Sequence, residues 1–297
     1  MRHNTQLPMT VTIAQHSAQP LTVSRLGYGT MRLPGPGVWG EPANRPEALE
    51  ILRTAVALGV NFLDTADYYG EDVTNRLIME ALHPYPQDLV ICTKVGATRQ
   101  PDKSWVPYNT PENMRTSIDN NLRTLKQDQI QLVHFRTMAH SQVPFAESLG
   151  AMFEMQQEGK ILHVGLSNVS REEVEAGLKM GAIATVENMY GYGQRTTLQT
   201  PHGESRGGEE VLDLCAQHGI PLIPYFSLLN SLPKADSKIT EIARKHTASE
   251  AQINLAWLLH KSPWILPIPG TSSLAHLREN LKAADIKLSE EDMAYLG

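Results

Sequence analysis

Short apolar segments alternate with amphipathic segments along almost the whole chain. Apolar runs typical of buried strands cover 60–64, 88–93, 130–133, 161–166, 183–186, 220–224 and 264–268, and a short Gly-rich strand is expected at 26–31. Helical spacing of apolar residues is found at 45–58, 74–82, 145–157, 209–217, 249–259 and 273–281. Thr110, followed by Pro111, and Ser170, followed three residues later by Glu173, each predict the start of a further helix.

This alternation of eight strands with about eight helices predicts parallel strands joined by crossover helices. Eight such units close into a (β/α)8 TIM barrel, and we expect one domain over 1–297. A doubly wound open sheet is the alternative. It is weakened because no G-x-G-x-x-G sequence opens a helix after the first strand.

Three segments depart from the regular alternation. Period-two alternation at Thr10–Ile13 and Leu21–Ser24 predicts a β-hairpin that caps one end of the fold. The glycines in 26–31 would allow another group to approach the backbone closely. The polar segment 191–208 is expected to be a long loop on the active face, either a lid or a disordered surface loop.

Composition narrows the class of protein. A chain of 297 residues can bury roughly 75% of its unfolded surface. A net charge of -6 argues against a nucleic-acid-binding surface, and no apolar run is long enough for a membrane span. Cys92 and Cys215 lie in apolar contexts without a C-x-x-C or a nearby His, so we expect buried thiols and no zinc site. The absence of a signal-peptide pattern predicts a cytoplasmic protein.

Mostly polar residues follow the predicted strands, and in a barrel these ends converge on one face. They are Asp64, Lys94, His134, Ser167, Asn168, Glu187, Asn188, Tyr225 and Gly270. Asp64, Lys94 and His134 would end three neighbouring strands, each roughly 5 Å from the next. Tyr69 lies in the loop after Asp64. For Asp64 and Tyr69 alone, an ordinary strand–loop boundary is an equally good interpretation.

Together these four groups suit proton transfer to a carbonyl oxygen. A nearby Lys94 ammonium would stabilise the Tyr69 phenolate and lower the tyrosine pKa, and Asp64 would hold the lysine in place. His134 could hydrogen-bond the oxygen that Tyr69 protonates as general acid. A carbonyl reduction needs a hydride source, which implies a nicotinamide or flavin cofactor.

The chain resembles the aldo-keto reductases over essentially its whole length. The matching segments are 26–30, 61–70, 93–94, 132–134, 165–168 and 268–280. The resemblance implies that Asp64, Tyr69, Lys94 and His134 form the catalytic tetrad of that family. Segments 70–75, 104–105 and 270–280 resemble the bacterial branch that includes pyridoxal reductases.

The same resemblance implies a site for NADPH. Ser167 and Asn168 match the residues that bind the nicotinamide carboxamide, and Glu187 stands where the family usually has Gln, so it can accept but not donate a hydrogen bond. Tyr225 matches the aromatic ring that stacks on the nicotinamide. The remaining positions matched to cofactor binding are Gly29, Thr30, Asp64, Ser227, Leu228, Gly270, Thr271, Ser272, His276, Glu279 and Asn280.

Besides Glu187, four residues depart from the family pattern. Gly270 and His276 stand where many members have the Lys and Arg that grip the 2′-phosphate of NADP, and His276 with Arg278 would have to compensate. His134 is followed by Phe135 and Arg136, whereas many relatives have a small residue and then Pro at these two positions, so the wall of the pocket differs.

The leading hypothesis is therefore an NADPH-dependent reductase of aldehydes or ketones, with pyridoxal as a candidate substrate. Trp105 lies in the loop after Lys94 and is either part of the substrate pocket or an exposed packing residue. A cofactor-sensing subunit with little turnover is the alternative. A metal-dependent barrel hydrolase is a weaker one, because we identify no ligand cluster.

Overall fold

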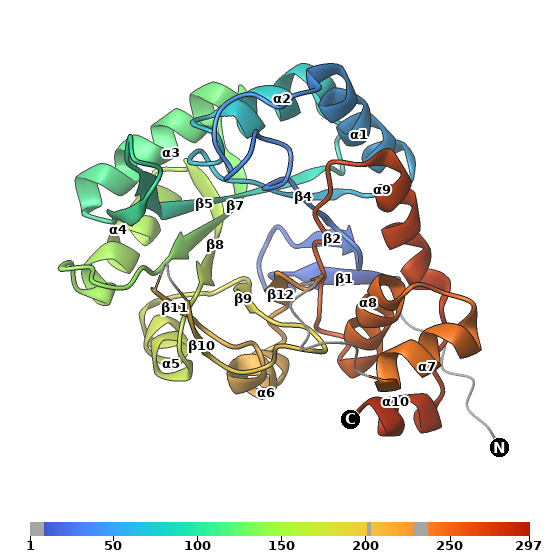
Figure 1. Ribbon diagram of the computed structural model, residues 1–297. Helices are drawn as coiled ribbons and strands as arrows, with labels where there is room; N and C mark the ends of the chain where they lie inside the picture. Colours follow the sequence, from blue (N-terminus) through green and yellow to red (C-terminus); the bar gives the residue numbers. More distant parts are fainter. Residues whose placement is uncertain (1–8, 201–202, 229–236) are drawn as a thin grey trace.

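A computed structural model describes residues 9–200, 203–228 and 237–297. Its central feature is a curled sheet of parallel strands inside a ring of helices (Figure 1). Seven parallel strands follow one another in the order β3, β4, β5, β7, β8, β9, β12. They are Tyr28–Gly29, Phe62–Asp64, Val90–Arg99, Ile130–Arg136, Ile161–Ser167, Val186–Met189 and Leu222–Tyr225.

Segment 264–268 occupies the eighth position and closes the sheet. It forms only an isolated parallel bridge, between Leu222 and Ile265, rather than a full strand. On its other side the Gly27 amide donates to the Pro267 carbonyl at 2.9 Å. The prediction of a (β/α)8 barrel is thereby confirmed, with the last strand shorter in its pairing than expected.

The helices form the outer layer. They are α1 (Arg45–Ala57), α2 (Val73–Leu82), α3 (Pro111–Leu125), α4 (Phe145–Gln157), α5 (Arg171–Met180), α6 (Glu209–Gln217), α7 (Ser237–His246), α8 (Glu250–Lys261), α9 (Leu274–Leu281), the short 3-10 helix η1 (Lys282–Asp285) and α10 (Glu290–Leu296). Thr110 and Ser170 cap α3 and α5 as predicted. Near the ends of the chain, α1 and α9 lie side by side (Figure 1), which closes the ring.

Strand residues alternate between the barrel interior and the helix layer. Phe62, Val90 and Leu132 belong to the interior cluster, whereas Leu63, Ile91 and Val133 pack outward against helices. This period of two fixes which side chains enter the barrel. Toward the carboxyl end of the strands the interior positions become polar. On β4, Phe62 is followed by Asp64; on β5, Val90 is followed by Cys92 and Lys94; on β7, Leu132 is followed by His134 and Arg136.

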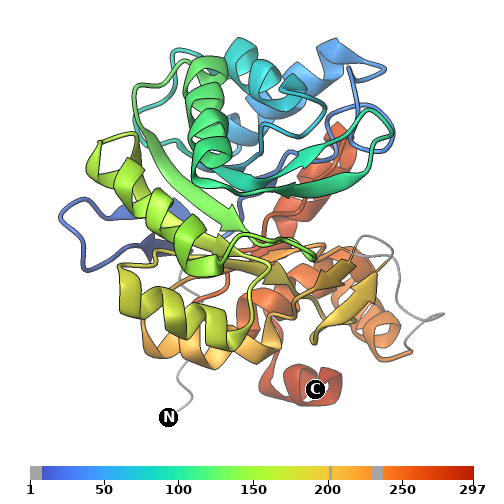
Figure 2. The same ribbon diagram turned by 90° about the vertical axis from the view of Figure 1, so that its left-hand side faces the viewer.

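The two ends of the barrel are different. The hairpin of β1 (Thr10–Ile13) and β2 (Leu21–Ser24) places Val11, Ile13 and Val23 against the apolar interior residues, so it caps the amino end as predicted. Figure 2 shows two other hairpins on the opposite side. One joins β5 to β6 (Trp105–Tyr108), and the other joins β10 (Leu198–Thr200) to β11 (Gly203–Ser205).

Several boundaries differ from the predictions. β5 does not end at Lys94 but continues to Arg99, because its outer half pairs with β6. The predicted loop 191–208 contains the β10–β11 hairpin, and its residues 201–202 lie outside the described part of the chain. Helix α7 was not predicted. None of the helices in the described residues combines the length and apolar character needed to cross a bilayer.

Candidate active site

Asp64, Lys94 and Glu187 form a buried charged group at the carboxyl end of the barrel. Each of these residues is at most 2% exposed. The Lys94 ammonium donates to Asp64 Oδ1 and to the Thr65 carbonyl at 3.3 Å, and it lies 3.4 Å from Glu187 Oε1. The strand register explains the arrangement, because β4, β5 and β7 are adjacent and Lys94 faces His134 across β5 and β7. One lysine therefore serves two carboxylates.

The two carboxylates differ in their electrostatics. Burial and the neighbouring Glu187 raise the pKa of Asp64 in spite of Lys94. Burial would also raise the pKa of Glu187, but Lys94 and His134 outweigh it, so the pKa of Glu187 is lowered. For Lys94, burial favours the neutral amine, yet the two carboxylates raise its pKa well above the usual value. The lysine is thus held as an ammonium ion.

His134 is fully buried, and both of its ring nitrogens are engaged inside the barrel. Nε2 lies 2.7 Å from Thr185 Oγ1, while Nδ1 lies 3.0 Å from Glu187 Oε2 and 3.2 Å from Cys92 Sγ. Burial lowers the pKa of the imidazole, which favours the neutral ring. In this arrangement His134 contacts Glu187 rather than presenting a nitrogen to the space beside Tyr69.

Tyr69 lies over the lysine. Its ring centre is 5.4 Å from the Lys94 ammonium, and the residue is 6% exposed. Burial raises the tyrosine pKa, and although Lys94 acts in the opposite direction, the net change is upward. The prediction of a lowered Tyr69 pKa is therefore wrong, because burial has a larger effect than Lys94. Tyr69 is therefore a protonated phenol at neutral pH, which is the form that an acid catalyst needs.

Four residues that shape this centre were not predicted from the sequence to belong to it. Thr185 and Cys92 contact His134, and Thr65 contacts Lys94. Gly165 provides the room for the imidazole, because a Cβ atom there would lie 2.3 Å from His134 Cδ2. The alternation of strand residues places Cys92 inside the barrel, and from this pattern its contact with His134 could have been predicted.

The residues predicted to hold the nicotinamide do lie together. Tyr225 donates from its hydroxyl to Asn168 Oδ1 at 2.9 Å, and Ser167 pairs with Glu187 in the β8–β9 register. The Asn168 side chain also donates to the Thr137 and Glu204 carbonyls. Asn168 is thus tied to the β10–β11 hairpin.

The segments matched to the rest of the cofactor site lie at the seam of the barrel. A Cβ on Gly29 would lie 2.7 Å from the Ile268 carbonyl oxygen, and one on Gly270 would lie 2.7 Å from that of Gly29. The group that closely approaches the backbone of Gly29 is therefore the neighbouring backbone of 268–270.

Beyond this seam the matched residues differ in exposure. Thr30, Thr271, Asn280 and Ser227 are buried, Leu228 and Glu279 are half-buried, and Ser272 and His276 are exposed. Ser273 caps α9. The exposed residues next to this helix start are the ones placed to meet a ligand from solvent.

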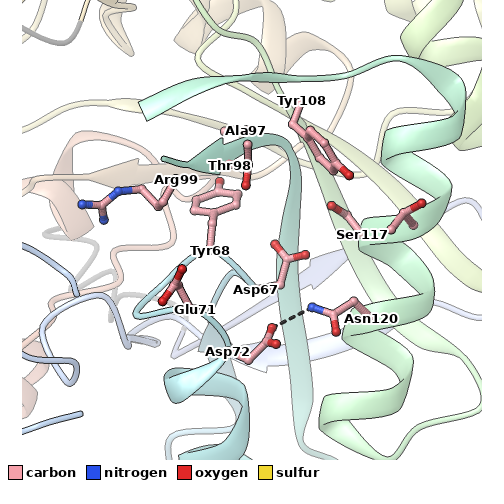
Figure 3. Close-up of a pocket in the computed structure, with 11 residues that line it drawn as sticks. Asp67, Tyr68, Glu71, Asp72, Ala97, Thr98, Arg99, Tyr108, Ser117 and Asn120 are labelled. Carbon is pink, nitrogen blue, oxygen red and sulfur yellow. Dashed lines mark hydrogen bonds between the residues drawn. The ribbon is translucent and has the colours of Figure 1, made fainter. Parts of the chain in front are cut away.

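Asp67 and Tyr68 line a separate cavity of about 240 Å³ (Figure 3). Asp67 points into it, and burial together with Asp72 raises the pKa of Asp67 to about 7. Within the described residues, Asp67 Oδ1 and the Tyr68 hydroxyl have no hydrogen-bond partner. Trp105 is half-buried, with its ring 5.5 Å from that of Tyr68 and 4.2 Å from the Arg99 guanidinium carbon.

The expectation that no metal-ligand cluster exists is corrected by the structure. Asp64, Cys92 and His134 are buried and offer ligand atoms within 4.8 Å of one another, and no other such group is found in the described residues. The distances arise because all three side chains enter the barrel. However, the Lys94 ammonium already pairs with Asp64, and burial raises the pKa of the Cys92 thiol, so both oppose a metal cation.

Comparison with known proteins identifies relatives of this chain. A sequence model described as "Aldo/keto reductase family" matches residues 25–297. The pyridoxine 4-dehydrogenase of Escherichia coli is 43% identical over 280 residues, which cover 93% of this chain and 94% of that protein.

Solved structures agree with the sequence comparison. A thermostable aldo-keto reductase in complex with the inhibitor epalrestat is 30% identical, with a TM-score of 0.80 and coverage of 97% and 98%. An aldo/keto reductase from Klebsiella pneumoniae in complex with NADP and acetate is 25% identical, with a TM-score of 0.77 and coverage of 98% and 94%.

Proposed function

We propose that this chain, which belongs to the aldo/keto reductase family, uses NADPH to reduce an aldehyde to an alcohol, with pyridoxal as its candidate substrate. An aldo/keto reductase of similar structure binds NADP. The observation that carries this proposal is the buried Lys94, which is held between two carboxylates beneath Tyr69. The substrate is proposed from the pyridoxine 4-dehydrogenase relative.

The residues around Tyr69 have distinct tasks in this reaction. Tyr69 gives its proton to the carbonyl oxygen as the alkoxide forms, and the Lys94 ammonium stabilises the phenolate that remains. Asp64 and Glu187 keep Lys94 charged and in position. His134, which is neutral and bonded to Thr185, positions Glu187.

The polar and aromatic groups of the site support a nicotinamide cofactor. Ser167, Asn168 and Glu187 offer hydroxyl, amide and carboxylate groups suited to a carboxamide, and Tyr225 offers an aromatic ring. Gly270, Thr271 and the start of α9 would hold the phosphate end. When bound, NADPH supplies the hydride.

A direct assay tests the proposal. The purified protein is mixed with NADPH and with pyridoxal or a panel of other aldehydes and ketones, and the cofactor absorbance is followed. We expect turnover of pyridoxal. Tight NADPH binding without turnover of any carbonyl compound would contradict the proposal and would favour a cofactor-sensing role instead.

A further inference from the structure

Arg136 is the last residue of β7 and belongs to the interior face of the barrel. Leu132 lies in the interior cluster, whereas Val133 and Phe135 pack outward against the helices. The alternation of a strand therefore places Arg136 on the same face as His134, two residues closer to the open end. The proton-transfer groups thus lie immediately below a cationic side chain.

Among the described residues, the Arg136 guanidinium has no acidic partner in direct contact. Within the described ranges, no carboxylate oxygen lies within 4.0 Å of it. Its neighbours are Ser167, whose Oγ is 3.4 Å from Nη1, and Tyr225, whose ring centre is 5.4 Å from Cζ. Burial would lower the pKa of Arg136, but Tyr225, Tyr68, Tyr69 and Glu187 raise it, so the charge is retained.

Three other described cations near this end of the barrel already have partners. Arg206 pairs with Glu204 at 2.8 Å. Arg99 donates to the carbonyls of Gly37, Val38 and Lys103. Lys94 has its two carboxylates. A half-buried guanidinium without a counter-ion among the described residues is suited to an anion from solution, because its planar donors match a carboxylate or another anionic oxygen.

We infer that Arg136 binds an anionic oxygen that the substrate carries beside its reacting carbonyl. This inference rests on the proposed function and specifies its substrate class, which is aldehydes with a phenolate or carboxylate on the neighbouring atom. The carbonyl of such a molecule reaches Tyr69 while its anionic oxygen meets the guanidinium. Pyridoxal belongs to this class, because its ring carries a phenolic oxygen next to the aldehyde.

Matched pairs of substrates test the inference. 2-Formylbenzoate is compared with its methyl ester, and ionised salicylaldehyde with 2-methoxybenzaldehyde, so that carboxylate and phenolate are examined separately. The ratio of kcat/KM within each pair is measured for the wild type, Arg136→Met and Arg136→Lys. The control is Arg171→Met, because Arg171 is an exposed residue of α5 that pairs with Glu175.

We expect the wild type to favour at least one anionic member tenfold or more, and the pair that shows this preference identifies the preferred anion. Arg136→Met should lower that ratio at least tenfold, Arg136→Lys should lower it less, and Arg171→Met should leave it unchanged. Equal ratios in the wild type and Arg136→Met would overturn the inference. A weakened NADPH affinity in Arg136→Met with an unchanged ratio would also overturn it, since Arg136 shares Ser167 and Tyr225 with the cofactor site.

A binding measurement separates this inference from the proposed function. Titration calorimetry of 2-formylbenzoate into the NADP-saturated protein requires no turnover. If no aldehyde is reduced, the proposed function fails, and binding that is lost in Arg136→Met still supports the anion site. Equal binding by the wild type and Arg136→Met would contradict the anion site whatever the activity.

Discussion

At the scale of single residues, Glu187 is the feature that most changes the expected site. The sequence predicts a strand at 183–186 with Glu187 just after it, whereas the structure places Glu187 inside β9; its difference from the usual Gln is readable from the sequence. Its contacts with Lys94 and His134 are not, because they depend on the register between β8 and β9. The second carboxylate raises the pKa of Tyr69 and so favours the protonated acid.

Replacing Glu187 by Gln should therefore lower the pKa of Tyr69. In alcohol oxidation the phenolate is the base, so the rising part of the kcat/KM profile should move to lower pH. Pyridoxine oxidation measured across pH would show this shift. Glu175→Gln, on the outer helix α5, is the matched control and should leave the profile in place. An unmoved profile in Glu187→Gln would show that Glu187 does not act on Tyr69.

Asp67 should make the protein less stable as pH rises. Its pKa in the folded protein is about 7, above the usual value of 3.8, because of burial and Asp72. The stability linked to its proton is fully present below the unfolded pKa and is lost as pH rises through about 7. Between pH ~5 and ~8 this contribution to the free energy of unfolding should fall by about 1–3 kcal/mol.

Urea denaturation of Asp67→Asn across the same pH range checks this expectation. The variant should lose less stability than the wild type as pH rises. Asp213→Asn, an exposed change on α6, should follow the wild type. The same dependence of unfolding free energy on pH in Asp67→Asn and the wild type would contradict the raised pKa of Asp67, which lines the cavity of Figure 3.

The orientation of His134 shows the limit of residue-level prediction. A polar residue at the end of a strand indicates a site, but it does not indicate where the ring nitrogens point. That direction depends on Gly165, which leaves space for the imidazole, and on Thr185, which binds it. Both residues are distant in sequence and become neighbours only through the parallel register.

At the scale of elements, regular helices were the most predictable parts. The bounds of α4 match the expected 145–157, because apolar spacing alone defines its buried face. The predicted end of β5, at Lys94, is five residues too early, because the outer half of the strand is stabilised by pairing with β6 and has no apolar run. Helix α7 was missed although Ile239, Ile242 and Ala243 have helical spacing.

The seam of the barrel predicts a large effect of a small substitution. Gly29→Ala would place a Cβ 2.7 Å from the Ile268 carbonyl oxygen, and neither backbone can move freely. We expect a loss of about 1–3 kcal/mol in the free energy of unfolding, measured by urea denaturation. Gly150→Ala is the control, because a Cβ at this position in α4 meets nothing within 4 Å. It should gain up to ~1 kcal/mol. Similar effects of the two substitutions would contradict the close packing of the seam.

At the scale of the whole molecule, the barrel interior changes from apolar to charged along its axis. The hairpin β1–β2 closes the apolar end, and Asp64, Lys94 and His134 occupy the other. The sequence predicted this polarity, because apolar strand residues come before polar ones on several strands. It did not predict that segment 264–268 would pair with β12 through one isolated bridge and with Gly27 through one backbone hydrogen bond, since this pairing depends on distant parts of the chain meeting.

The central claim is that Tyr69 delivers the proton in carbonyl reduction, and Tyr69→Phe tests it most directly. The change removes one hydroxyl and keeps the ring that lies over Lys94. With NADPH and pyridoxal, kcat should fall by roughly 10²- to 10⁴-fold, while NADPH affinity and the urea midpoint stay close to those of the wild type. Near-normal turnover in Tyr69→Phe would contradict the account.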